Sequence, residues 1–264
     1  MTTLNWIAFG IFAICWLGYE PVVQRVARYR GLSSKDLSVI RAGWMQQAVI
    51  RDIKLVDSNL LGHGINSASF FASANLILIA AVGGALFSGE MSLRTVKELG
   101  IDTSSSRLFE IKLALVTVCL VRGLLDFIWA IRQMNYCVAG IGAAPEDLRG
   151  EDASAYARAL SQVIDPAMTH FSQGVRGYYF ALAAAAWLYG PQALMIASVG
   201  AVILLMWRQS GSQSAKGLRD IRILLERKNP PQTGTDLGFS ADIAPQQENL
   251  SDKSPEITRK DRHA

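Results

Sequence analysis

The sequence has 264 residues, of which 50% are hydrophobic and only 18% are charged. A soluble globular chain usually carries more charge, so the composition favours a membrane protein. The formal net charge of +4 is modest, and no module combines aromatic and basic residues as nucleic-acid-binding proteins do, so we expect no nucleic-acid partner.

Five apolar segments are candidates for membrane-spanning helices. They comprise residues 4–19, 65–87, 111–131, 166–189 and 191–208. The first is expected to be retained, because it lacks the basic start and the small-residue cleavage site of a signal peptide. The sequence therefore predicts an all-α fold, a multipass transmembrane helical bundle within residues 1–210.

The last apolar stretch decides the number of spans. Residues 177–207 contain no charge over 31 residues, and one helix of that length would measure ~46 Å against a hydrocarbon core of ~30 Å. Gly190-Pro191, near its middle, is typical of one helix ending and another beginning, and Asp165-Pro166 is typical of a helix start. We predict five spans, with four as the alternative.

Basic flanks give the expected orientation, since Lys and Arg gather on the cytoplasmic side. Residues 20–63 carry seven Lys/Arg against four acids, and residues 208–228 carry six against two. Five spans place both segments in the cytoplasm, with the N-terminus outside and the C-terminus inside. We expect a bacterial inner-membrane protein.

Helices outside the bilayer are also expected. A capping box and mostly helical apolar spacing predict a cytoplasmic amphipathic helix over residues 34–64. A cytoplasmic surface helix is expected over residues 211–228. The polar composition of residues 229–264 predicts a disordered tail.

Arg122 and Asp126 are the most informative candidate site, because they lie inside the otherwise apolar segment 111–131. Charged groups at such depth cost several kcal/mol unless they pair or face an aqueous cavity. Their i,i+4 spacing puts them on one helical face, where they can neutralise each other. A structural couple and a pathway or binding role both fit this pattern.

Further polar residues complete the candidate set. Arg132, Gln133 and Asn135 extend the polar part of the same helix, and Arg51 and Asp57 mark the cytoplasmic helix. Small and polar side chains let membrane helices approach closely. We therefore assign helix packing to three residues of the second span: Asn66, Ser69 and Ser73.

Catalytic and metal-binding patterns are not seen. Cys15, Cys119 and Cys137 are scattered through apolar segments without the C-x-x-C spacing of a redox or zinc site. No nucleophile and base, or metal-ligand set, stands out. We expect no enzymatic activity, no cofactor and no metal.

Several motifs resemble a known family. The most specific is Trp129-x-x-Arg132-Gln133-x-Asn135-Tyr136, and Gly177-Tyr178-Tyr179-Phe180 is a second. Over about residues 5–210 the chain resembles the bacterial and plant membrane-protein family catalogued as domain of unknown function 599. The resemblance implies an integral membrane protein and supplies no activity or substrate. The position of Asp126 is often basic in that family, which favours Arg132 and Asn135 as site candidates.

Two functions are consistent with these features. In the favoured one, the protein lets a small solute or ion cross the bilayer, with Arg122 and Asp126 as the buried charged element and Arg132, Gln133 and Asn135 at its cytoplasmic opening. A pore would then need a homo-oligomer. The alternative is a non-catalytic scaffold or assembly partner, whose helix around Arg51 and Asp57 docks a cytoplasmic protein. A water-accessible path to Arg122 would favour passage, and a dry centre the scaffold.

Overall fold

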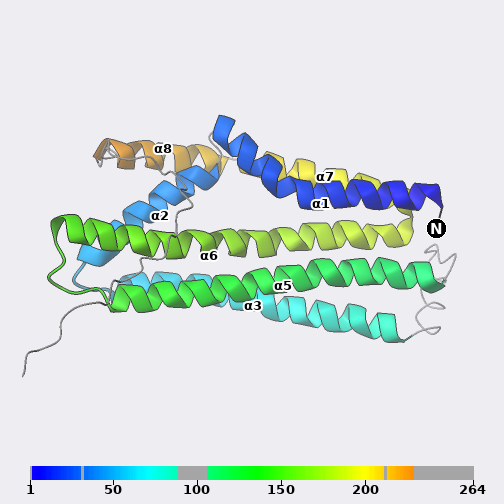
Figure 1. The fold of residues 1–264 in the computed structure, drawn as a ribbon, viewed down its shortest axis with the longest axis horizontal. Coiled ribbons are helices and arrows are strands. Elements are labelled where there is room, and N and C mark those ends of the chain that lie inside the picture. Colours follow the sequence, from blue (N-terminus) through cyan, green and yellow to red (C-terminus); the bar gives the residue numbers. More distant parts are fainter. Residues whose placement is uncertain (1, 31–32, 89–105, 211–212, 229–264) are drawn as a thin grey trace, which may run out of the picture. The chain divides into compact units, whose positions relative to one another are not determined.

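The computed structural model describes residues 2–30, 33–88, 106–210 and 213–228. Its regular elements there are all helices, as the sequence predicts (Figure 1). In chain order they are α1 (Thr3–Arg30), α2 (Ser33–Ile50), α3 (Leu55–Phe87), α5 (Ser106–Gly142), α6 (Gly150–Ala185), the 3-10 helix η1 (Ala186–Tyr189), α7 (Pro191–Ser210) and α8 (Gln213–Lys228). The expected disordered tail, residues 229–264, lies outside the described residues.

The two longest helices, α5 and α6, form an antiparallel pair that organises the other helices. α3 packs along α5, α1 packs along α7, and α2 packs against α6 and α8 (Figure 1). α5 has 37 residues and α6 has 36, so each is ~55 Å long, well beyond the ~30 Å hydrocarbon core of a bilayer. Both helices therefore extend past any membrane that they cross.

Three of the described helices are long and apolar enough to cross a membrane: α3, α5 and the Pro191–Arg208 part of α7. α1 and α6 are long enough but more polar. This composition is that of a helical membrane protein, and the number of crossings stays a prediction.

The predicted break at Gly190-Pro191 is confirmed. Gly190 has a φ of 135°, a conformation that side chains other than glycine rarely adopt, and α7 begins at Pro191. Proline suits this first helical position, because its missing N–H has no partner there in any helix. The apolar stretch 177–207 is therefore two helices.

The predicted helix start at Asp165-Pro166 is wrong, because α6 runs through it from Gly150 to Ala185. The Asp165 carboxylate does not cap a helix. It accepts a 2.8 Å hydrogen bond from Ser38 Oγ and forms an ion pair with Arg41, both on α2. These contacts hold α2 on the middle of α6, at the position where the local sequence suggested that a helix starts.

The single helix predicted over residues 34–64 is also wrong. α2 ends at Ile50 and α3 begins at Leu55, and the turn between them is closed by a buried carboxylate. Asp57 Oδ1 accepts hydrogen bonds from Trp44 Nε1 at 2.8 Å and from Arg51 NH1 at 2.7 Å. Trp44 and Arg51 thus donate to one acceptor, Asp57, which lies beyond the break in α3.

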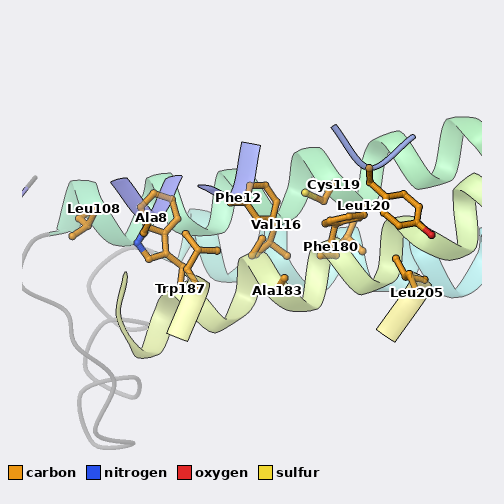
Figure 2. Packing of buried hydrophobic residues seen from close by; sticks show 14 residues of the cluster. Ala8, Phe12, Leu108, Val116, Cys119, Leu120, Phe180, Ala183, Trp187 and Leu205 are labelled. Carbon is orange, nitrogen blue, oxygen red and sulfur yellow. The ribbon is translucent and has the colours of Figure 1, made fainter. Parts of the chain in front are cut away.

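Two hydrophobic cores lie at different levels of the helix bundle. The first surrounds Phe12, Phe180 and Trp187 and joins α1, α5, α6, η1 and α7 (Figure 2). Trp187 is fully buried, and its Nε1 donates a 3.0 Å hydrogen bond to Asn5 Oδ1. The second core contains Met45 and Met134 and joins α2, α3, α5 and α6. Cys119 belongs to the first core and Cys137 to the second, where both pack as small buried hydrophobes.

Candidate functional site

Arg122 and Asp126 lie near each other on α5 but have separate partners. Asp126 Oδ1 is 3.0 Å from Nδ1 of His170 on α6, and the Arg122 guanidinium lies over the Trp16 ring of α1, 5.9 Å from its centroid. The i,i+4 spacing places both charges on one face of α5. Arg122 nevertheless contacts α1, and Asp126 contacts α6. Asp126 is held by tertiary contact with His170, which itself stacks on Trp129.

Both residues line a cavity between α1, α5 and α6. The cavity has a volume of about 30 Å³, space for roughly two water molecules. Its lining consists of Trp16, Tyr19, Glu20, Arg122, Gly123, Asp126, Gln173, Arg176, Gly177 and Phe180. Charged side chains of three helices therefore meet at one small cavity.

Two arginines and two carboxylates line the cavity, and the two kinds of side chain have different contacts. Glu20 Oε1 accepts a hydrogen bond from Gln173 Nε2, and Asp126 contacts His170. The Arg176 guanidinium lies over the Tyr19 ring, 5.6 Å from its centroid. Within the described chain, no carboxylate lies within ion-pair distance of Arg122 or Arg176.

A buried hydroxyl belongs to the same cavity. Tyr19 is 5% exposed, and its OH has no hydrogen-bond partner among the described residues. A buried polar group without a partner is costly. The cavity thus contains donors that no neighbouring side chain satisfies.

Glycines allow α5 and α6 to approach closely beside the cavity. A Cβ atom on Gly177 would come within 3.2 Å of Gly123 Cα, and one on Gly123 would come within 3.3 Å of Asn75 Nδ2. Asn75 is buried and donates a 2.8 Å hydrogen bond to Leu120 O, which links α3 to α5. Small residues and interhelical hydrogen bonds are the usual means of membrane-helix packing.

The packing residues expected on α3 are placed differently. Asn66 and Ser73 are exposed in this chain, and Ser69 is half-buried. The close polar contact of α3 is made by Asn75, two positions beyond Ser73. The spacing of small residues indicated one face of this helix, and the buried amide of Asn75 lies on a different face.

Arg132, Gln133 and Asn135 are not brought to the cavity. Arg132 is exposed and lies between the rings of Trp129 and Tyr136, 5.6 Å from each centroid. Asn135 donates a 3.0 Å hydrogen bond to Ile131 O within its own helix. Gln133 Oε1 is buried without a hydrogen-bond partner among the described residues. These residues form a separate group on α5, beyond Asp126.

Arg51 and Asp57 are brought together, in the turn that joins α2 to α3. Asp57 is fully buried and its Oδ2 has no described partner. On the other side of this turn, Lys54 Nζ donates to Ala144 O in the loop between α5 and α6. The pair therefore fastens the α2–α3 turn within the chain itself.

Glu20, Gln173 and Arg176 line the cavity, and His170 contacts Asp126 beside it. None of these four residues was predicted from the sequence as a site residue. The first span was expected to end at Tyr19, whereas α1 continues through Pro21 to Arg30. On α6 a signal was present, since His170, Gln173 and Gly177 recur at steps of three and four and thus share one face. Lys112, inside the segment treated as otherwise apolar, is buried with 2% exposure. The described residues contain no group of three or more His, Cys, Asp or Glu side chains placed to hold a metal ion.

The apolar helices α3, α5 and α7, with a charged cavity between α5 and the more polar α1 and α6, are those of a helical membrane protein. Residues 7–214 match the family described as protein of unknown function, DUF599, and the chain belongs to that family. The resemblance noted in the sequence is thereby confirmed. No curated protein and no solved structure gives a significant match to the chain.

Proposed function

We propose that this protein lets a small ion or solute cross the bacterial inner membrane, and that the α1–α5–α6 cavity is where it is held. The observation that supports this most is the meeting of Arg122, Asp126, Glu20 and Arg176 at one cavity between α1, α5 and α6, of which α5 is apolar enough to cross a membrane. Ionisable groups in such surroundings are costly, and where they occur they commonly mark an ion or substrate pathway. The role is non-enzymatic and needs no cofactor.

The proposed topology has five crossings, with the N-terminus outside and the C-terminus in the cytoplasm. It is supported by the arrangement of helix ends: the starts of α1 and α5 and the ends of α3 and α6 lie at one end of the bundle (Figure 1). The five-span order requires that arrangement. A reporter enzyme fused after Lys228 should be cytoplasmic, and a periplasmic reporter would contradict five crossings.

The size of the cavity bears on how passage would occur. A volume of about 30 Å³ holds water-sized groups and is far below the ~300 Å³ of a typical small-molecule pocket. We therefore propose that small ions are carried, and that a continuous path forms between copies in a homo-oligomer or through a rearrangement of α1.

Reconstitution into liposomes tests this function. Ion flux under an imposed potential should exceed that of protein-free liposomes, and Arg122→Gln should reduce it because the variant removes a charge from the cavity. Arg158→Gln removes an exposed arginine of α6 outside the cavity and serves as the matched control. Background flux with correctly folded wild-type protein would contradict passage.

A scaffold role is the second candidate, and α8 is the observation that favours it. α8 is anchored to α2 by the 3.0 Å ion pair between Arg222 and the buried Asp36, while its Ile221 and Leu224 are 47% and 61% exposed. An anchored helix with exposed apolar side chains can dock a cytoplasmic protein. Crosslinking from a photoreactive residue at Leu224 in cells should capture such a protein, whereas crosslinks to lipid alone would contradict docking there.

A further inference from the structure

We infer that the α1–α5–α6 cavity binds an oxyanion of the phosphate type, held by Arg122, Arg176 and the Tyr19 hydroxyl. This inference rests on the proposed function, because it assigns the ligand of the same cavity. It concerns binding chemistry, which can be measured separately from passage.

The two guanidiniums that line the cavity contact aromatic rings and, among the described residues, no carboxylate. Arg122 and Arg176 each contact an aromatic face, at 5.9 and 5.6 Å from the ring centroids. A contact of this kind engages no hydrogen-bond acceptor, so it does not satisfy the N–H groups of the guanidinium. Within the described residues neither guanidinium has an ion pair.

The two carboxylates at the cavity already hold donors from α6. Glu20 accepts from Gln173, and Asp126 lies 3.0 Å from His170 Nδ1. A cation would have to compete with these contacts, whereas an anion meets two guanidiniums without competition from a bound carboxylate. The balance of existing contacts therefore favours an anionic ligand.

The Tyr19 hydroxyl is an independent indication of a ligand. It is buried at 5% exposure in the cavity lining and lacks a hydrogen-bond partner among the described residues. A hydroxyl donates one hydrogen bond, and an oxygen of an anion between the two guanidiniums would accept it. Pairs of arginine and phosphate are frequently bidentate, with two parallel N–H···O bonds.

The size and the surroundings of the cavity narrow the class further. About 30 Å³ admits roughly two oxygen-sized atoms, so the remainder of a phosphate group would lie outside the cavity. Because α5, which lines the cavity, is apolar enough to cross a membrane, the phosphate group has two sources: a phospholipid headgroup or a free phosphate ion.

Two measurements on the full-length protein in detergent distinguish these sources. The thermal midpoint is measured in sodium phosphate and in sodium chloride of equal ionic strength, and native mass spectrometry records whether phosphatidylglycerol is retained after delipidation and re-addition. A rise in the midpoint with phosphate identifies a free oxyanion. Retained phosphatidylglycerol without that rise identifies a headgroup. Either result supports the site.

Variants test whether the binding uses this cavity. Tyr19→Phe removes only the hydroxyl, and Arg176→Gln removes one guanidinium; each should weaken binding by about tenfold, the effect of losing one hydrogen bond to a charged group. Arg158→Gln should bind as the wild type does. If Arg176→Gln fails to fold, Tyr19→Phe still decides. Wild-type affinity in Tyr19→Phe, or no binding of phosphate or phosphatidylglycerol to the wild type, would overturn the inference.

The liposome flux assay separates this inference from the proposed function. Ion flux without any oxyanion binding would overturn the oxyanion site and leave passage standing. Oxyanion binding without flux would leave the site standing and remove passage.

Discussion

Gly177 on α6 lies so close to Gly123 on α5 that a Cβ atom added to Gly177 would come within 3.2 Å of Gly123 Cα. This approach brings the two longest helices together beside the charged cavity, whose lining includes both glycines. The width of the cavity therefore depends on the helix contact next to it.

Gly177→Ala should separate α5 from α6 and destabilise the protein by ~1–3 kcal/mol, as overpacking of a tight contact does. Thermal unfolding in detergent measures this. Gly200→Ala is the matched control, because a Cβ atom there meets nothing within 4 Å. That variant should be neutral or slightly stabilising, since alanine favours helices over glycine. Equal midpoints for the two variants would contradict the close contact.

A second prediction concerns the partner of Asp126. In double-variant cycles with Asp126→Asn, coupling to His170→Gln should be ~1 kcal/mol, the range for side chains in direct contact. Coupling to Arg122→Gln should be smaller, because Arg122 lies over Trp16. Unfolding midpoints of the six proteins in the two cycles give both values. If Asp126 coupled more strongly to Arg122 than to His170, the i,i+4 pair expected from the sequence would be the main interaction.

On α3, Asn75 and Ser73 should respond differently to substitution. Asn75→Leu removes the buried hydrogen bond to Leu120 O and should cost ~1–2 kcal/mol. Ser73→Leu should fold with the stability of the wild type, because Ser73 is exposed. Yield and thermal midpoint after detergent extraction compare them. Loss of stability in Ser73→Leu would indicate that this face contacts another copy of the chain.

The anchoring of α8 by Arg222 can be tested by proteolysis. The hydrogen bonds that Arg222 donates to Glu226 and Asp36 raise the pKa of Arg222 above its usual value, so its charge persists at all working pH values. Arg222→Ala leaves the buried Asp36 carboxylate unpaired, which is strongly unfavourable. Trypsin should then cleave within α8 several-fold faster than in the wild type. Arg227→Ala, an exposed arginine of the same helix, should leave the rate at the remaining sites unchanged.

The helical class and the break before α7 could be predicted because they depend on local sequence. Gly190-Pro191 specifies a turn wherever it occurs, and long apolar segments form helices in a bilayer without help from neighbours. Asp165-Pro166 looked like an equally good start signal, but Asp165 is used by Ser38 and Arg41 of another helix. Such long-range use of a local signal is not visible in one sequence.

For the same reason, only two of the four charged residues that line the cavity could be predicted from the sequence. Arg122 and Asp126 stood out because charge in an apolar segment is conspicuous, and both do line the cavity. Glu20 and Arg176 lie near the ends of apolar segments, where charge is ordinary. Their approach to the cavity depends on how α1 and α6 pack, and this packing cannot be predicted from the spacing of residues along the chain.

Pro166 lies between two contacts of α6: Asp165 is bound by α2, and His170 contacts Asp126 of α5. Because proline has no N–H, one backbone hydrogen bond of the helix is missing there, and helices bend most readily at such a point. The bending stiffness of α6 is therefore lowest between the half that carries α2 and the half that lines the cavity. Any change in angle between these halves is concentrated within that one turn, which places the mechanical pivot of the helix beside His170.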